Sequence, residues 1–153
     1  MGASRETARR ALHVPFRPRL ARVVALVLGV VVAAGTPVLV LTVPGDYGFA
    51  DLGGFAAVGA AIVWFCWREA SVRALVDERG VTVRNLMLTR RVEWAEIVSV
   101  RFGQGRPWVQ LDLADGDTLA VMGVQRADGA FAAAEASRMA TLVALHARTA
   151  RND

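Results

Sequence analysis

Residues 23–43 read VVALVLGVVVAAGTPVLVLTV and contain no charged side chain. At the rise of an α-helix, these 21 residues extend over about 31 Å, which is close to the thickness of the hydrocarbon core of a bilayer. After a polar break, a second apolar segment extends over about residues 49–67, with Asp51 as its one charged residue. The sequence therefore predicts two membrane-spanning helices joined by a short loop, a transmembrane hairpin over residues 23–67.

The arginines are distributed unevenly around this hairpin. All 18 basic residues are Arg, and six of them precede the first apolar segment, whereas the loop at residues 44–48 contains an Asp and no Arg. Loops that stay in the cytoplasm are enriched in basic residues. We therefore expect a multi-pass plasma-membrane protein with a basic N-terminal segment, residues 1–22, and with both termini in the cytoplasm. Because the arginines are concentrated beside the hairpin, the formal net charge of +4 does not indicate a nucleic-acid partner.

From residue 69 onward, the spacing of apolar residues changes from helical to alternating. Residues 71–87, SVRALVDERGVTVRNLM, alternate on both sides of a turn that contains Gly80, and Asp115-Gly116-Asp117 marks a second hairpin. Trp94 and Ile97 bound a turn between two further short strands. Six strands followed by an Ala-rich helix at 130–148 predict an α+β fold, in which the C-terminal helix caps a curved antiparallel sheet or barrel. This domain extends over residues 69–148, and residues 149–153 form a tail.

Four segments in this order resemble a bacterial PH-domain family: DERGVTVRN (77–85), RRVEWAEIVSV (90–100), LDLADGDTLAV (111–121) and the closing helix at 125–146. The family is that of the actinobacterial membrane proteins grouped with the low-molecular-weight protein antigens. The resemblance implies a PH-like fold after two membrane spans, and it implies no known reaction. The positions that carry its structural motif are Gly80, Trp94, Ile97 and Gly116.

The sequence contains no evident catalytic or metal-binding constellation. Glu93 and Glu96 have no positioned nucleophile nearby, and the Asp-Gly-Asp turn lacks the further ligands of a calcium loop. Cys66 is the only cysteine and is expected to face lipid or the partner helix. We therefore expect a protein that is not an enzyme and that requires no cofactor or metal.

The residues best suited to contact a membrane surface are four arginines that follow the second apolar segment: Arg68, Arg73, Arg90 and Arg91. Each juxtamembrane arginine contributes roughly 1 kcal/mol near an anionic surface. The main hypothesis is a membrane-anchored PH-like interaction module on the cytoplasmic face, which binds a protein or peptide partner of unknown identity. The alternative is an inner-leaflet domain that binds or senses anionic lipid.

Further expectations concern single residues. Pro15 and Pro18 interrupt the N-terminal segment, so we expect a flexible lead-in with Phe16 at the depth of the lipid head groups. Asp128 is suited to cap the last helix. Trp94 is expected to pack in the core or at its rim, and His146 is expected on the polar face of the last helix.

Overall fold

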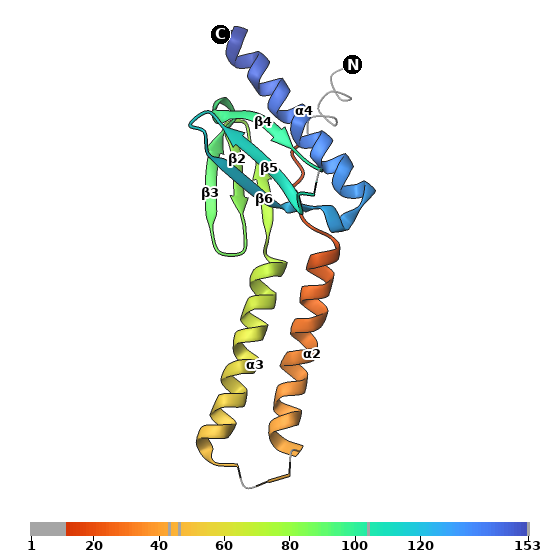
Figure 1. Cartoon of the computed structure of the whole chain (residues 1–153), viewed down its shortest axis with the longest axis vertical. Coiled ribbons are helices and arrows are strands. Elements are labelled where there is room, and N and C mark those ends of the chain that lie inside the picture. The colour runs from red at the N-terminus through yellow and green to blue at the C-terminus, as the bar shows by residue number, and fades with distance from the viewer. Residues whose placement is uncertain (1–11, 43, 46, 104, 153) are drawn as a thin grey trace. The chain divides into compact units, whose positions relative to one another are not determined.

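The computed structural model of the chain describes residues 12–42, 44–45, 47–103 and 105–152, which form two compact units (Figure 1). One unit is a helical hairpin, Leu20–Ser71. The other unit joins the described residues before Leu20 to those from Val72 onward. The predicted α+β fold is confirmed, with two apolar N-terminal helices, two antiparallel three-stranded sheets and a C-terminal helix.

The hairpin consists of α2 (Leu20–Thr42) and α3 (Phe49–Ala70). By length and composition alone, both helices are long and apolar enough to cross a membrane. Small residues bring them together, because a Cβ atom added to Gly59 would overlap the side chain of Thr36. Cys66 is buried against Gly29 of the partner helix, which is one of its two expected placements.

The second unit contains two antiparallel sheets. Sheet A contains, in spatial order, β1 (Arg73–Val76), β2 (Gly80–Arg84) and β3 (Thr89–Glu93). Sheet B contains β4 (Ile97–Arg101), β5 (Trp108–Leu113) and β6 (Thr118–Gln125). The 3₁₀ turn η1 (Trp94–Glu96) connects the two sheets. The β5–β6 turn contains Gly116 at a φ of 88°, a conformation that favours glycine.

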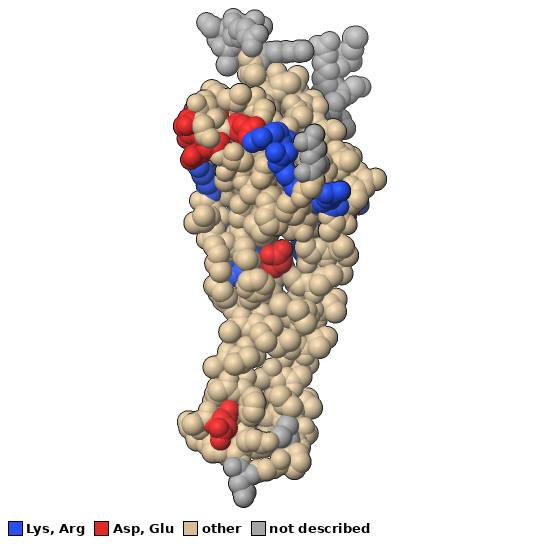
Figure 2. Space-filling view, viewed as in Figure 1, with Lys and Arg blue, Asp and Glu red and all other residues tan. Residues whose placement is uncertain are grey.

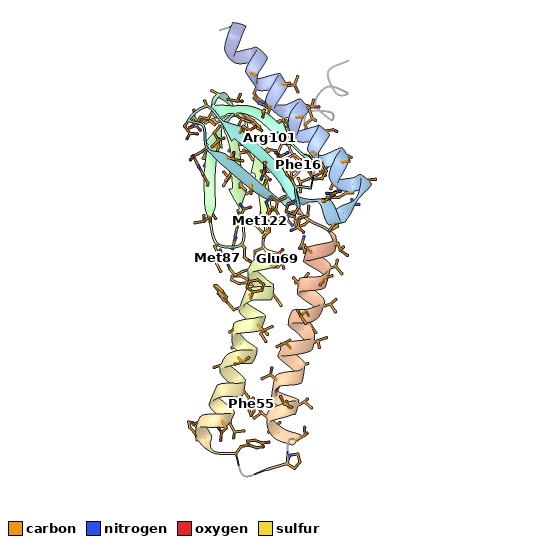
Figure 3. The ribbon with its side chains drawn as sticks, viewed as in Figure 1. Phe16, Phe55, Glu69, Met87, Arg101 and Met122 are labelled. Atoms are coloured by element: carbon orange, nitrogen blue, oxygen red, sulfur yellow. The ribbon has the colours of Figure 1, made fainter. Side chains whose placement is uncertain are left out.

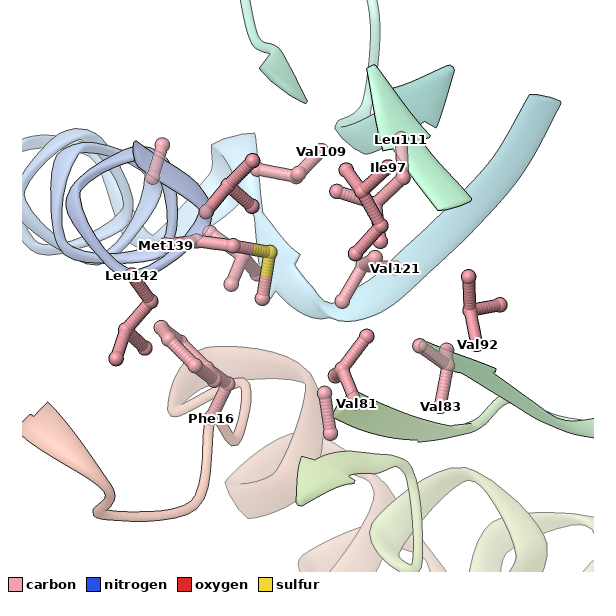
Figure 4. Close-up of a cluster of buried hydrophobic side chains, with 14 of the residues drawn as sticks. Phe16, Val81, Val83, Val92, Ile97, Val109, Leu111, Val121, Met139 and Leu142 are labelled. Atoms are coloured by element: carbon pink, nitrogen blue, oxygen red, sulfur yellow. The ribbon is translucent and has the colours of Figure 1, made fainter. Parts of the chain in front are cut away.

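The C-terminal helix α4 (Ala130–Asn152) packs against the sheets and closes the core between them (Figures 1 and 4). Its buried side chains recur at helical spacing and include Met139 and Leu142, which are almost fully buried with Leu111 and Val121 of sheet B. A 3₁₀ turn, η2 (Arg126–Asp128), precedes this helix, so Gly129 and not Asp128 is the residue directly before it.

Phe16 is part of this core although the hairpin separates it in sequence from the rest of the domain. Its side chain is completely buried, and its backbone exchanges two hydrogen bonds of 2.9 Å with Ala74 of β1. The expectation that Phe16 lies at head-group depth in a flexible segment was therefore wrong. Because Pro15 and Pro18 favour extended backbone, the segment between them is suited to pair with a strand.

Candidate functional site

One end of sheet A has arginines on neighbouring strands. Arg73, at the start of β1, pairs directly with Arg84 at the end of β2, so the two side chains extend from the same face of the sheet. Like charges that are directly opposed destabilise an antiparallel pair. The Nε of Arg73 is also buried and has no hydrogen-bond partner among the described residues. This pair is therefore a candidate site for an anionic group.

Arg90 and Arg91, on β3, are each engaged by carboxylates. Guanidinium nitrogens of Arg90 lie 3.3 Å from a carboxylate oxygen of Asp117 and 3.5 Å from one of Asp115. A guanidinium nitrogen of Arg91 lies 2.8 Å from a carboxylate oxygen of Asp77. Acidic and basic side chains accordingly lie next to each other on the visible face of the domain (Figure 2). Exposed pairs of this kind contribute only about 0–1 kcal/mol to stability. They nevertheless reduce the positive charge that Arg90 and Arg91 present to an anionic surface.

The four arginines that the sequence indicates for membrane contact thus lie on three different elements. Arg90 and Arg91 share a strand, Arg73 lies on β1 of the same sheet, and Arg68 lies in the last turn of α3, in the hairpin unit. Their role at a membrane surface stays a prediction. Arg84 is missing from that set, and only the register of β1 against β2 identifies it as the neighbour of Arg73.

The turn between β1 and β2 is organised by Asp77. Its carboxylate accepts hydrogen bonds from the backbone N–H groups of Arg79 (2.8 Å) and Gly80 (3.0 Å) and from the side chain of Arg91 (3.0 Å). Desolvation raises the pKa of Asp77, but these hydrogen bonds outweigh it and hold the pKa below its ordinary value. With Asp77 and Glu78 beside Arg79, this turn is not suited to bind a highly charged anion.

A second polar cluster crosses the three strands of sheet B. Asp112 on β5 accepts hydrogen bonds from Ser99 on β4, from Arg101 and from Thr118 on β6. The hydrogen bond from Ser99 contributes most to a pKa of Asp112 below its ordinary value. Because its pKa is lowered and Arg101 and Thr118 also donate to it, the Asp112 carboxylate is a weak base and is poorly suited to activate the Ser99 hydroxyl as a nucleophile. Across the described residues, no group of three or more His, Cys, Asp or Glu side chains is arranged to hold a metal.

The turn between β2 and β3 exposes apolar side chains. Met87 and Leu88, both in this turn, are 62% and 74% exposed, and Figure 3 shows the position of Met87. The turn is held in place by Asn85, whose side-chain amide donates to the carbonyl of Ala120 (2.7 Å) and accepts from the N–H of Met122 (3.1 Å). Sequence reasoning missed this feature. Three consecutive apolar residues, Leu86, Met87 and Leu88, which follow an alternating strand and Asn85, were the available signal.

Trp94 and His146 form a stacked pair, with ring centroids 4.6 Å apart and planes inclined by 12°. Trp94 is buried and donates a hydrogen bond from Nε1 to the carbonyl of Asp77 at 2.9 Å. Trp94 therefore packs in the core, as expected. His146 is partly buried and does not lie on an exposed polar face of the helix. The helical period predicts that His146 lies outside the apolar stripe, but the indole ring of Trp94 stacks on the His146 ring and covers it.

Comparison with known proteins agrees with this architecture. Residues 71–142 match the family described as Bacterial PH domain. Uncharacterized proteins of Mycobacterium tuberculosis and Mycobacterium bovis are each 34% identical over 95 residues, which is 62% of this chain and 62% of each relative. The low molecular weight protein antigen 6 of M. tuberculosis is 48% identical over 48 residues, 31% of this chain and 42% of that protein. No solved structure matches the chain.

The family match coincides with the segments that carry the resemblance in the sequence. The matched region begins just after α3 and ends within α4, so it contains both sheets. The chain spans about three fifths of the length of the uncharacterized relatives. Residues 71–142 therefore match a bacterial PH domain, and the chain is similar to mycobacterial proteins that include a low molecular weight protein antigen.

Proposed function

We propose that the chain is a membrane-anchored, non-enzymatic interaction module. Its PH domain would lie on the cytoplasmic face of the plasma membrane and bind a protein or peptide partner. The observation that carries the topology of this proposal is the position of Phe16. Because this residue precedes α2 and is buried in a core built from residues after α3, both ends of the hairpin must lie on the same side of any membrane. If α2 crosses the bilayer, α3 must cross back.

The surface of the hairpin unit supports the same proposal. Large apolar side chains along α2 and α3 are exposed within that unit, for example Val30, Val31 and Val58. Soluble monomers rarely expose apolar surfaces of this extent, whereas lipid covers them without penalty. The acidic loop and the basic flanks favour a cytoplasmic position for the PH domain.

We propose the following organisation of the chain. Residues 1–22 form the basic N-terminal segment, residues 23–67 the transmembrane hairpin, and residues 69–148 the PH-like domain, which is completed by the residues around Phe16. Interaction is the general role of PH domains, and the hydrogen bonds that occupy the carboxylates of Asp77 and Asp112 support the non-enzymatic part of the proposal.

Topology is tested by reporter fusions to the full chain. Green fluorescent protein fused after Asp153 should fluoresce, and alkaline phosphatase inserted at Gly48 should be active, because the first folds in the cytoplasm and the second outside it. Phosphatase activity from a fusion after Asp153 would contradict the proposal.

The alternative, binding of anionic lipid, is favoured by the direct pairing of Arg73 with Arg84. A photo-crosslinking amino acid at Leu75, which is exposed on the same face of β1 as Arg73, separates the two partner classes in cells. A protein adduct supports the main proposal, and a lipid adduct supports the alternative. The same crosslinker at Val98, exposed on sheet B, serves as the control.

A further inference from the structure

We propose that the β2–β3 turn, with its exposed side chains Met87 and Leu88, inserts into the interface of the bilayer that the hairpin crosses. This inference rests on the proposed function, because it requires α2 and α3 to be membrane helices. It assigns to the PH domain a second, apolar contact with lipid, in addition to any attraction between arginines and anionic head groups.

The strand register locates the turn within the domain. Arg84, the last residue of β2, pairs with Arg73, the first residue of β1, and with Thr89, the first residue of β3. Residues 85–88 therefore leave sheet A at the end where β1 begins. The sequence connects this same end to the hairpin, since β1 begins three residues after Ala70, the last residue of α3.

The segment before α2 reaches the same end of the sheet. Phe16 pairs with Ala74, the second residue of β1, and α2 begins only four residues after Phe16. Both connections between the domain and the hairpin therefore start from the end of sheet A that carries the β2–β3 turn. A hairpin that crosses a bilayer holds this end of the domain close to the lipid surface.

The order of apolar and basic residues along the turn matches the order of layers at a lipid surface. The turn contains two consecutive exposed apolar residues, Met87 and Leu88, and the row of the sheet next to the turn contains Arg73 and Arg84. At a strand rise of about 3.3 Å per residue, the arginines lie roughly 3–7 Å behind Leu88 and Met87, which is comparable to the thickness of a head-group layer. Segments that lie in a membrane interface usually place apolar side chains at the boundary of the acyl chains and arginine side chains at the lipid phosphates. Phosphate would also separate the opposed charges of Arg73 and Arg84.

The turn is already ordered for this contact. Asn85 donates to the carbonyl of Ala120 and accepts from the N–H of Met122, so its amide fastens the turn to β6. The Asn85 N–H donates to the carbonyl of Leu88 at 2.8 Å and closes the turn itself. A contact surface that is fixed in advance loses little conformational entropy when it inserts.

Lipid is favoured over a protein as the occupant because the apolar surface is small. Two side chains are far less than the roughly 800 Å² per partner that a stable protein interface buries. A tethered bilayer needs no such area, since the hairpin keeps it at a high effective concentration.

The test uses the full chain in vesicles of phosphatidylcholine and phosphatidylglycerol. In a Cys66→Ala background, Met87→Cys carries an environment-sensitive fluorophore, and quenching by nitroxide-labelled lipid is compared with quenching by aqueous iodide. The matched control is Glu78→Cys, which lies in the exposed β1–β2 turn at the opposite end of the same sheet. We expect lipid to quench the probe at residue 87 and iodide to quench the probe at residue 78.

A third probe separates failure of this inference from failure of the proposed anchoring. Val27→Cys places the fluorophore on an exposed position of α2. If lipid does not quench the probe at residue 27, the anchoring fails and the inference fails with it. If lipid quenches residue 27 while residue 87 behaves like residue 78, the inference is overturned and the anchoring stands. The inference would also be overturned if iodide reaches residue 87 in vesicles while a cysteine at residue 87 is protected from thiol reagents in cells. That result would assign the turn to a protein partner.

Discussion

The guanidinium carbon of Arg138 lies 3.7 Å from the centroid of the Phe16 ring. A cation on α4 thus covers an aromatic ring that precedes the first helix, a contact that stabilises both segments. The same guanidinium donates to the carbonyls of Leu12 (2.7 Å) and Val14 (2.8 Å) and forms an ion pair with Glu135. This cluster fastens the segment before the hairpin to the PH domain.

Phe16→Ala should destabilise the domain by about 3–5 kcal/mol, because it removes a completely buried aromatic side chain. The measurement is urea unfolding of a hairpin-deleted variant, in which a short flexible linker joins Arg19 to Val72. Antiparallel pairing of Phe16 with Ala74 brings these two ends close enough for such a linker. Arg17→Ala, at the exposed neighbouring position, should change stability by less than about 0.5 kcal/mol. Equal effects of the two substitutions would show that Phe16 is not a core residue.

Leu142→Asp should unfold the hairpin-deleted variant, since it introduces an unpaired charge where α4 meets the sheets. Thr141→Asp places the same charge one residue earlier on an exposed position of the helix and should leave the fold intact. Circular dichroism distinguishes the two variants. If Leu142→Asp melts like the parent, α4 does not close the core.

Gly80 and Gly116 should respond differently to substitution. A Cβ atom at residue 80 would overlap the carbonyl of Val92, so Gly80→Ala and Gly80→Asn should both destabilise, by about 1–3 kcal/mol. At Gly116 there is open space, and only its φ of 88° opposes a side chain. Gly116→Ala should cost about 1–2 kcal/mol, and Gly116→Asn less, because Asn tolerates this conformation. Chemical unfolding of the four variants tests the ranking, and rescue by Asn at residue 80 would refute the steric explanation.

The stability of the domain should fall in acid partly through Asp77. Because the pKa of Asp77 is lowered in the folded state, its contribution is complete above the ordinary Asp pKa of about 3.9. That contribution is lost as the pH falls through the lowered value. Below about pH 4, the free energy of unfolding of Asp77→Asn should therefore decrease less steeply with falling pH than that of the parent domain. Glu78→Gln removes one charge from the same turn and provides the comparison, and an identical flattening by both would argue against a specific role for Asp77.

Arg73 and Arg84 should dominate the attraction of the hairpin-deleted variant to anionic vesicles, because carboxylates already engage Arg90 and Arg91. Arg73→Gln and Arg84→Gln should each weaken co-sedimentation more than Arg91→Gln does. Binding should also decrease as salt rises, since such attraction is screened over about 10 Å at 0.1 M ionic strength. Equal losses of vesicle binding from all three substitutions would mean that the ion pairs do not reduce the attraction of Arg91 to anionic lipid.

Local patterns were sufficient to predict the helices, the six strands and the turns at Gly80 and Gly116. Each of these depends on residues within a few positions of one another. The place of Phe16 was not predictable in this way, because an aromatic residue between prolines beside an apolar helix suits an interface and a core equally well. The pairing of Arg73 with Arg84 requires the register, and the contact of Arg90 with Asp117 requires both sheets to be assembled.

The pairing of Phe16 with Ala74 also couples the folding of the domain to the insertion of the hairpin. During synthesis, Phe16 leaves the ribosome before both helices, whereas the rest of its core follows them. If the hairpin inserted with only one crossing, Phe16 and Ala74 would end on opposite faces of the bilayer, and the core could not close. The incomplete domain would expose its apolar interior to proteases. Only chains with correctly inserted helices would then survive, so the fold of the domain would act as a check on the membrane topology of the whole protein.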